Sequence, residues 1–206
     1  MVTENTFGRW ETEQQLWLAL RQGDEQAFTF IFEKYHRTLY NYGCKLTTHT
    51  AVTEDAIQDI FIDIWRLRAN LTEHISSIKF YLYRTLRRRI HQTLDKYPAT
   101  EEIAELSEPD IMPLSFSDSQ TLLIESESNL IRAQRIRELL ALLPERQLEA
   151  ITLRYFDEFS IEEIGQIMGV NEKSVRNFLY KALTAFRQAQ NSIISFLLII
   201  CALPLS

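Results

Sequence analysis

The chain has 206 residues and a formal net charge of −6, a length that suits one medium-sized domain or two small ones. With five Gly, five Pro and no Asn-Gly or Asp-Gly pair, it lacks the signals of β-hairpins, and its composition is that of a soluble protein with long helices. Cys44 and Cys201 stand far apart, which argues against a zinc site or a disulfide framework and fits a reducing cytoplasm. The first residues show no basic segment followed by an apolar one, so we expect no signal peptide.

The acidic charge is concentrated in one segment. Residues 97–128 contain eight Asp or Glu, no Lys or Arg and three of the five prolines, whereas the chain on either side is nearly neutral. Such a segment cannot bury enough apolar surface to offset its loss of conformational entropy on ordering. We therefore predict an all-α protein with two small helical domains, at residues 11–96 and 129–190. A flexible acidic linker joins them, and an apolar tail follows at residues 191–206.

Three helices are expected in the N-terminal domain. The first covers residues 24–46, DEQAFTFIFEKYHRTLYNYGCKL, whose apolar residues recur at the spacing of one helix face and predict a buried stripe. The members of this stripe are Phe28, Ile31, Phe32, Tyr35, Leu39 and Tyr42.

The second helix covers TEDAIQDIFIDIWRLR, with Thr53 as the expected N-cap and two acids in its first turn. A second apolar stripe consists of Ile57, Phe61, Ile64 and Trp65. On another face, acidic residues recur every four positions at Asp55, Asp59 and Asp63. This acidic row is either a solvated surface or a docking surface for a basic partner.

The third helix carries FYLYRTLRRRIHQTL, residues 80–94, in which arginines are set among aromatic rings. At about 100° per residue, one face is apolar and consists of Leu82, Leu86, Ile90 and Leu94. The opposite face is expected to carry Arg84, Arg87, Arg88 and His91, with Phe80 and Tyr81 at its edges. Arg89 falls near the apolar side, where it snorkels or meets an acid. Guanidinium groups contact phosphates and rings stack on unpaired bases, so this face suits single-stranded nucleic acid; a solvated charged face is the alternative.

The C-terminal domain contains the pattern of a helix-turn-helix. Ser160 and Glu163 form a capping box at the start of a short helix, Gly169 ends it, and Asn171 caps the next helix. The second helix has an apolar side, and its polar side consists of Lys173, Arg176, Asn177, Tyr180 and Lys181. Such side chains suit the major groove of DNA, although an ordinary helical hairpin would also show a polar face. Two helices that break at Pro144 precede this motif and can brace it.

Both halves together resemble the sigma-70 superfamily of bacterial RNA polymerase initiation factors, in the extracytoplasmic-function (ECF) form. The likeness covers about residues 20–190, in the family's order of segments. DEQAFTFIFEKYHRTLY, TEDAIQDIFIDIWRLRANL and FYLYRTLRRRIHQTL are similar to the opening, the polymerase-clamp segment and the promoter-melting segment of sigma region 2. LPERQLEAITLRYFDEFSIEEIGQIMGVNEKSVRNFLYKAL is similar to region 4.

The resemblance implies a cytoplasmic, non-enzymatic sigma factor that needs no cofactor or metal. It implies polymerase contacts, on the clamp, by Asp55, Gln58, Asp59, Phe61 and Trp65. Melted minus-ten DNA is implied to contact Phe80, Tyr81, Arg84, Arg87, Arg88 and His91. The minus-thirty-five duplex is implied to contact the polar side of the second helix of the helix-turn-helix. Further implied partners are the polymerase flap and an anti-sigma factor, with no small-molecule substrate.

Two positions depart from the family pattern. Arg88 stands where the family more often has asparagine, at the pocket for a flipped base, which leaves the minus-ten preference open. Asp95 and Lys96 replace a more basic end of the helix, which implies fewer phosphate contacts. The tail, NSIISFLLIICALPLS, lies outside the resemblance. Its apolar run is too short to span a bilayer, which takes about 20 residues, so we expect it to extend the last helix and to pack on the domain or on a partner.

Two other functions are alternatives to that of a sigma factor. Glu33 and His36 form one half of the carboxylate–histidine pattern of di-iron helical bundles, but the chain has no second half and no phosphate-binding loop. A stand-alone helix-turn-helix repressor or activator is the nearer alternative, and it leaves the arginine-aromatic helix without a role.

Overall fold

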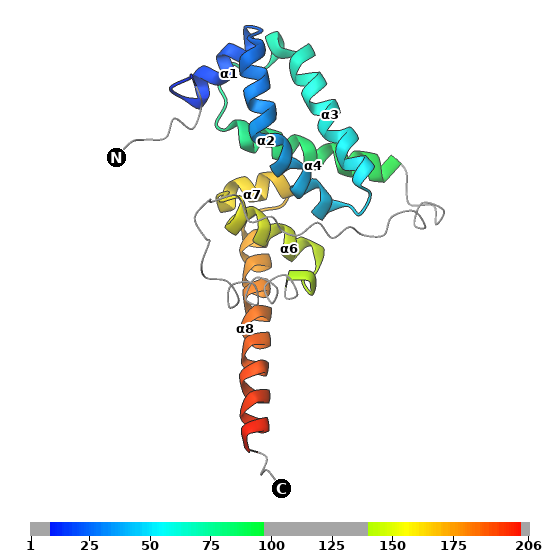
Figure 1. The fold of residues 1–206 in the computed structure, drawn as a ribbon, viewed down its shortest axis with the longest axis vertical. Helices are drawn as coiled ribbons and strands as arrows, with labels where there is room; N and C mark the ends of the chain where they lie inside the picture. Colours follow the sequence, from blue (N-terminus) through cyan, green and yellow to red (C-terminus); the bar gives the residue numbers. More distant parts are fainter. Residues whose placement is uncertain (1–8, 97–139, 203–206) are drawn as a thin grey trace, which may run out of the picture. The chain divides into compact units, whose positions relative to one another are not determined.

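A computed structural model describes the backbone of residues 9–96 and 140–202 and the side chains of these ranges up to Gln188. The regular elements in these ranges are all helical, as predicted (Figure 1). The chain divides into two compact units, residues 1–110 and 111–206, and each is described by itself. The acidic linker predicted at residues 97–128 lies outside the described residues.

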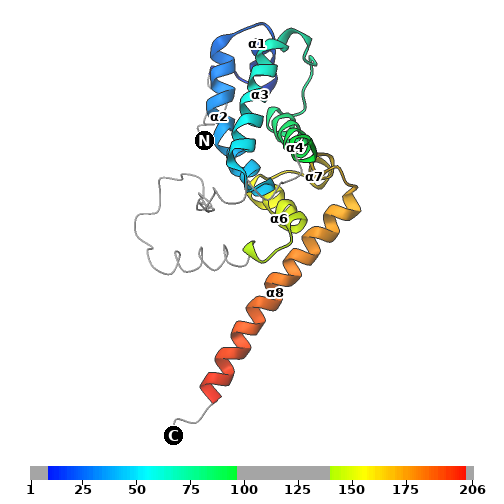
Figure 2. The same ribbon diagram turned by 90° about the vertical axis from the view of Figure 1, so that its right-hand side faces the viewer.

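Unit 1 contains the helices α1 (Glu13–Arg21), α2 (Glu25–Leu46), α3 (Thr50–Arg66) and α4 (Ile78–Lys96), with a short 3₁₀ turn, η1 (Arg68–Asn70), after α3. Helices α2 and α3 run antiparallel, and α4 packs against both (Figures 1 and 2). The core between them is formed by the predicted apolar stripes, which include Ile31, Leu39, Ile57, Ile64, Leu82, Leu86 and Ile90. Phe32 is an exception, because much of its side chain is exposed while its ring edge packs on Phe61.

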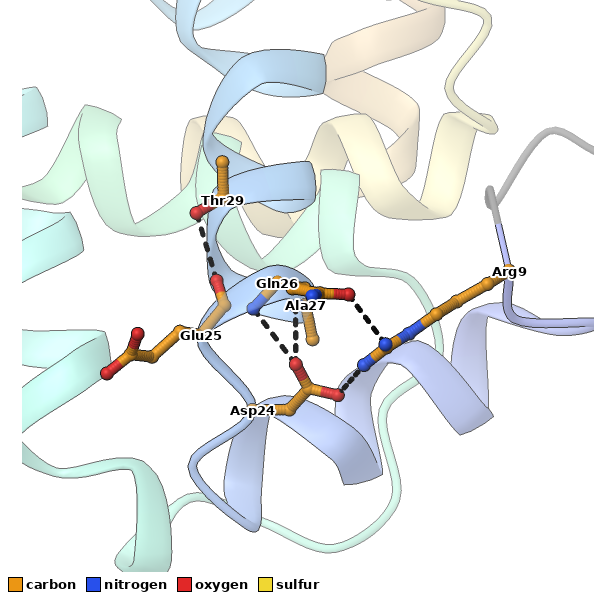
Figure 3. Close-up of polar contacts among 6 residues, drawn as sticks. All are labelled: Arg9, Asp24, Glu25, Gln26, Ala27 and Thr29. Atoms are coloured by element: carbon orange, nitrogen blue, oxygen red, sulfur yellow. Dashed lines mark hydrogen bonds and ion pairs between the residues drawn. The ribbon is translucent and has the colours of Figure 1, made fainter.

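Asp24 fixes the start of α2. Its Oδ1 accepts hydrogen bonds from the backbone N–H groups of Gln26 and Ala27, at 2.9 and 3.2 Å (Figure 3). These are two of the donors that a helix N-terminus leaves without an intrahelical partner. The other carboxylate oxygen pairs with Arg9, whose Nη1 also donates to Gln26 Oε1 at 2.6 Å. The segment before α1 is thereby joined to the first turn of α2.

Thr53 is not the N-cap that the sequence predicted. Helix α3 begins at Thr50, one turn earlier, and His49 occupies the N-cap position. Thr53 lies inside the helix and is fully buried against α2, where its neighbour is Gly43. A Cβ atom on Gly43 would lie only 2.3 Å from Thr53 Cγ2. The two helices therefore approach each other so closely that position 43 has no room for a side chain.

Helix α1 was not predicted, although its sequence carries the signals of a helix. The Thr12 side chain accepts a hydrogen bond from Gln15 N as an N-cap. Leu16, Trp17 and Leu20 recur at helical spacing and are fully buried. This short amphipathic pattern adds a fourth helix to the three that were expected in the N-terminal domain.

Four side chains of α1 hold the segment that leads into α4. Gln14 donates to Glu73 O at 2.8 Å, Trp17 Nε1 donates to Thr72 O at 2.8 Å, and Arg21 Nε donates to Leu71 O at 3.0 Å. Glu13 accepts a hydrogen bond from Ile78 N at 2.8 Å and so caps the first turn of α4. The backbone of residues 71–78 thus finds its hydrogen-bond partners on α1.

The Glu13 carboxylate also has a neighbour on α2. Burial raises the pKa of the Tyr35 phenol. The charge of Glu13 and a hydrogen bond to Glu13 raise this pKa further. The phenol therefore stays protonated at neutral pH and can donate to the carboxylate. Through Glu13, α1 is connected to both α2 and the start of α4.

Unit 2 contains α6 (Glu145–Ile151), a π-helical turn labelled η3 (Thr152–Phe156), α7 (Ile161–Met168) and α8 (Glu172–Ala202). Helix α6 begins directly after Pro144, at the break that the sequence indicated, and the helix expected before Pro144 lies largely outside the described residues. In the π turn the Asp157 N–H donates to Thr152 O at 3.1 Å, a wider ring than in an α-helix. Helices α6 and α7 both pack on α8.

The capping signals of α7 are confirmed. The Ser160 hydroxyl accepts from Glu163 N, and the Glu163 carboxylate accepts from Ser160 N at 2.8 Å. Gly169 ends the helix in the left-handed conformation, with φ of 67°. Asn171 Oδ1 accepts from Ser174 N at 2.8 Å and caps α8, which continues as one helix to Ala202.

This continuous helix confirms that residues beyond 190 extend α8, while the predicted packing of the tail concerns side chains outside the described set. Among the helices of the described residues, none has the length and apolar character needed to cross a membrane.

Gly43→Ala is expected to destabilise unit 1 by about 1–3 kcal/mol, because the new methyl group clashes with Thr53. The three tryptophans of the chain, Trp10, Trp17 and Trp65, all lie in unit 1. Tryptophan fluorescence during urea unfolding therefore measures the stability of this unit.

The matched control is Gly165→Ala in unit 2, where a Cβ would lie 2.9 Å from Val170 O. This change should leave the tryptophan transition in place. The double variant Gly43→Ala/Thr53→Ala should regain part of the lost stability, since the alanine at position 53 removes the clashing methyl. An unchanged urea midpoint for Gly43→Ala would show that the close approach of α2 and α3 is not a constraint.

Candidate nucleic-acid and partner-binding surfaces

The outer face of α3 forms one candidate surface. Its exposed residues are Asp55, Gln58, Asp59, Ile62 and Arg66, which follow one another at helical spacing. We call these five residues the α3 face. Of the five residues that the sequence proposed for polymerase contact, the structure places Asp55, Gln58 and Asp59 on it.

Phe61 and Trp65 do not lie on the α3 face. Phe61 is only 3% exposed, in agreement with its place in the predicted apolar stripe. Its ring meets those of Phe28 and Phe32, with centroid distances of 6.0 and 4.9 Å. Trp65 is half-buried, packs on Phe28 at 5.1 Å and is covered by the guanidinium of Arg68. Both rings face α2, because they continue the inward stripe of α3, and they support the α3 face from behind.

The acidic row of α3 is largely paired within the unit. Arg89 on α4 donates from Nη1 to Asp59 at 3.0 Å and from Nη2 to Asp63. Arg66 also pairs with Asp63, at 2.8 Å. The expectation that Arg89 meets an acid is therefore confirmed. Asp55 makes no ion pair within the described residues and is the carboxylate of the row that stays open to a cationic partner.

Ile62 is a residue that the sequence reasoning missed. It is 52% exposed in the middle of the α3 face, between the carboxylate side chains and Arg66. A signal was present, because Ile62 follows Asp59 by three positions and Asp55 by seven, which places it on the acidic side of the helix. A partner that covers the α3 face would remove this apolar side chain from water, which favours binding.

The second candidate surface lies on α4. Arg84 and Arg88 are exposed, one turn apart, and neither makes an ion pair within the described residues. Phe80 and Tyr81 are half-buried beside them. Burial raises the pKa of the Tyr81 phenol, and the charge of Arg88 opposes this shift. The phenol is therefore neutral at physiological pH and can both stack and donate a hydrogen bond.

Arg87 does not share this exposed face. Only 9% of the residue is accessible, because it lies four residues after Tyr83 and three before Ile90, and both of these are fully buried. Its solvent-facing placement in the sequence analysis is therefore wrong. His91 is half-buried on the same side of α4. The arginines that a nucleic acid can reach directly on this helix are Arg84 and Arg88.

The third candidate surface is the outer side of α8. All five polar residues predicted for it are exposed: Lys173, Arg176, Asn177, Tyr180 and Lys181. Tyr180 is 67% exposed. The opposite side is anchored, since Val175, Leu179 and Ala182 are buried against α6 and α7. Arg176 forms an ion pair of 2.6 Å with Glu172, one turn earlier, which holds its guanidinium at the N-terminal end of the helix.

The turn between α7 and α8 is tight because it packs on a second glycine, Gly165, which was not among the signals predicted from the sequence. Gly165 lies against the turn, and a Cβ there would come within 2.9 Å of Val170 O. Small size at position 165 and the left-handed Gly169 together allow α8 to follow α7 closely. This geometry is a helix-turn-helix in which the first turns of α8 project from the unit.

A helix-turn-helix with an exposed polar helix, preceded by a unit with an exposed arginine-aromatic surface, defines a DNA-binding transcription factor. Two family models match the chain: "Sigma-70 region 2" over residues 31–97 and "Sigma-70, region 4" over residues 133–186. The chain belongs to the sigma-70 family and is an RNA polymerase sigma factor of the ECF type. This family is non-enzymatic.

Similar proteins support this assignment over most of the chain. The RNA polymerase sigma-H factor of Pseudomonas aeruginosa is 26% identical over 186 residues, covering 87% of this chain and 94% of that protein. The ECF RNA polymerase sigma factor SigW of Bacillus subtilis is 25% identical over 175 residues, covering 82% of this chain and 91% of that protein.

Solved structures share the fold. CnrH, in complex with the cytosolic domain of CnrY, has a TM-score of 0.55 at 14% identity, covering 87% of this chain and 97% of that chain. The sigma factor RpoE of Bartonella quintana, in complex with the anti-sigma factor NepR, has a TM-score of 0.54 at 18% identity. That match covers 81% of this chain and 96% of the RpoE chain.

Proposed function

We propose that this sigma factor acts in the cytoplasm. Its three surfaces, on α3, α4 and α8, are proposed to bind polymerase, the melted strand and the upstream duplex. The observation that supports this assignment of roles is that the two units carry different DNA-binding chemistry. Unit 1 presents arginines beside aromatic rings, which suits unpaired bases, and unit 2 presents a helix-turn-helix, which suits a duplex. A factor with both can hold a promoter at two places while polymerase opens it.

The α3 face is the proposed contact with the clamp of core polymerase. Asp55, Gln58 and Asp59 supply acceptors for a basic partner, and Ile62 supplies an apolar anchor between them. Phe61 and Trp65 contribute by keeping α3 in place on α2, since their rings pack against Phe28. In the proposed surface Ile62 and Arg66 therefore take the place of the two rings that the resemblance implied.

The α4 surface is the proposed contact with the melted minus-ten strand. Arg84 and Arg88 are available for phosphates, and Phe80 and Tyr81 are available for bases. Arg87 lies too far toward the core to be a first contact and is proposed to support the surface from beneath, whereas His91, half-buried like the two rings, stays a proposed contact.

The polar side of α8 is the proposed reader of the minus-thirty-five duplex. Arg176 and Asn177 project from its first turns, where a recognition helix meets base edges. Lys173 and Lys181 lie at the margins and suit phosphates, and Tyr180 lies between them. The polymerase flap is the proposed second contact of unit 2.

An anti-sigma factor is a further proposed partner. Both solved structures named above were determined as complexes, RpoE with an anti-sigma factor and CnrH with the cytosolic domain of CnrY. The likeness in fold makes the same kind of regulation reasonable for this chain.

The clamp assignment predicts that Asp55→Lys weakens binding to core polymerase by about tenfold or more, because it places a cation where the partner is basic. Asp55 is a cleaner probe than Asp59, since a change at Asp59 also breaks the pair with Arg89. Fluorescence titration of labelled protein with core polymerase measures the affinity. Glu33→Lys, the same charge change on an exposed residue of α2, is the control and should bind like the parent. Parent-like affinity for Asp55→Lys would refute the assignment.

The melting assignment predicts that Arg84→Ala combined with Arg88→Ala slows open-complex formation on a duplex promoter several-fold. The lost phosphate contacts matter most when the strands separate, because these arginines hold the unpaired strand beside the rings. The same holoenzyme should be much less impaired on a template with a pre-melted bubble. Equal defects on both templates would indicate that these arginines contact duplex DNA or polymerase instead.

The reader assignment predicts that Arg176→Ala or Asn177→Ala loses about 1–3 kcal/mol of discrimination at one upstream base pair. Lys181→Ala should weaken binding to all sequences alike and reduce the salt dependence. The assay is transcription by holoenzyme on a panel of mutated upstream elements, because the two units act together only when polymerase fixes their spacing. These side chains are exposed, so each variant should keep the parent's stability within about 0.5 kcal/mol. Unchanged base preferences in both variants would exclude α8 as the reader.

A further inference from the structure

One guanidinium group connects two of the proposed surfaces of unit 1. Arg89 belongs to α4, which carries Arg84 and Arg88 on its exposed side. Its Nη1 lies 3.0 Å from Asp59 Oδ2, and its Nη2 contacts Asp63, both on α3. Among the ion pairs of residues 9–96 that the structure describes, these are the ones that join α3 to α4.

The arrangement suits an arginine in particular. Asp59 and Asp63 are four residues apart, so their carboxylates lie one turn apart on the same side of α3. A planar guanidinium can donate to both at once, whereas an ammonium group is a single point of charge. The second oxygen of Asp63, Oδ1, accepts from Arg66 at 2.8 Å. Carboxylates and guanidinium groups therefore alternate along the edge of the α3 face.

The members of this cluster differ in exposure. The side chain of Asp59 is 61% exposed, while that of Arg89 is 28% exposed. Asp59 thus faces outward, and its orientation is set by the partly buried cation beside it. In the free protein the pair is weak, because water and salt screen it. A partner that covers α3 excludes this water and strengthens the pair.

We propose that Arg89 is a positioning residue for polymerase docking, an inference that rests on the proposed clamp-binding role of the α3 face. Arg89 holds Asp59 and Asp63 in the orientation that the partner meets, and it does not itself touch the partner. Because Arg89 is part of α4, docking on α3 also fixes the helix that presents Arg84 and Arg88. The coupling is reciprocal, so a change in the position of α4 alters the affinity of the α3 face.

The test is a double-mutant cycle in which the affinity of the full chain for core polymerase is measured without DNA. Arg89→Gln is expected to weaken core binding about two- to fivefold, the range for a partly exposed pair. In a background that carries Asp59→Asn and Asp63→Asn, the same change should have little further effect. Arg89→Lys should restore only part of the affinity, since an ammonium group lacks the planar fork of donors with which a guanidinium spans two carboxylates. Lys96→Gln, which removes an exposed cation from the same helix, is the matched control and should bind core like the parent.

Two results would overturn the proposal: parent-like affinity for Arg89→Gln, or an equally large loss in the Asp59→Asn/Asp63→Asn background. Tryptophan fluorescence shows whether each variant keeps unit 1 folded, and if Arg89→Gln unfolds, Arg89→Lys completes the same cycle. Asp55→Lys separates this proposal from the clamp assignment. If Asp55→Lys loses core binding and the Arg89 variants do not, only the positioning role of Arg89 fails.

Discussion

The packing of α3 between α2 and α4 is the constraint on which unit 1 depends. One side of α3 is buried along its whole length, from Thr53 to Ile64, and the other side carries the exposed residues proposed to meet polymerase. A helix cannot rotate about its axis without exchanging these two sides. The contact between Gly43 and Thr53 fixes the distance of α3 from α2, and the pairs of Arg89 fix its edge against α4. The chemistry of the outer face is thus set by what the inner face must bury.

Unit 2 depends on local signals more than on long-range packing. The capping box of Ser160 and Glu163, the left-handed Gly169 and the Asn171 cap all act within a few residues of each other. They determine where α7 ends and where α8 starts, and therefore which residues of α8 lie in its first, projecting turns. The buried residues Val175 and Leu179 then determine which side of α8 faces outward.

This difference explains how far the sequence could predict the molecule. The polar side of α8 was predicted residue by residue, because short-range caps and one apolar side define it. On α4 the prediction for Arg87 was wrong, because that helix is buried by two neighbours and its buried arc is wider than one stripe of leucines indicates. Phe61 was assigned to polymerase contact through a likeness between sequences, whereas its position in the apolar stripe with Ile57 and Ile64 predicted the buried placement that the structure shows. The pairing of Arg89 with two acids about 30 residues away, and the close approach of Gly43 to Thr53, depend on tertiary contacts that a periodic pattern does not contain.

The hydrogen bonds between α1 and residues 71–78 have a consequence for the order of folding. The hydrogen bonds from Gln14, Trp17 and Arg21 to this segment, and from Ile78 to Glu13, join positions 50 to 65 residues apart. Such distant contacts close a large loop and form slowly compared with the helices themselves. Within this unit α1 is synthesised before α2 and α3, yet the segment that its side chains bind emerges only after both of these helices are complete. The hydrogen bonds of α1 to residues 71–78 are therefore expected to form late in the folding of unit 1, and the segment before α4 becomes ordered with them.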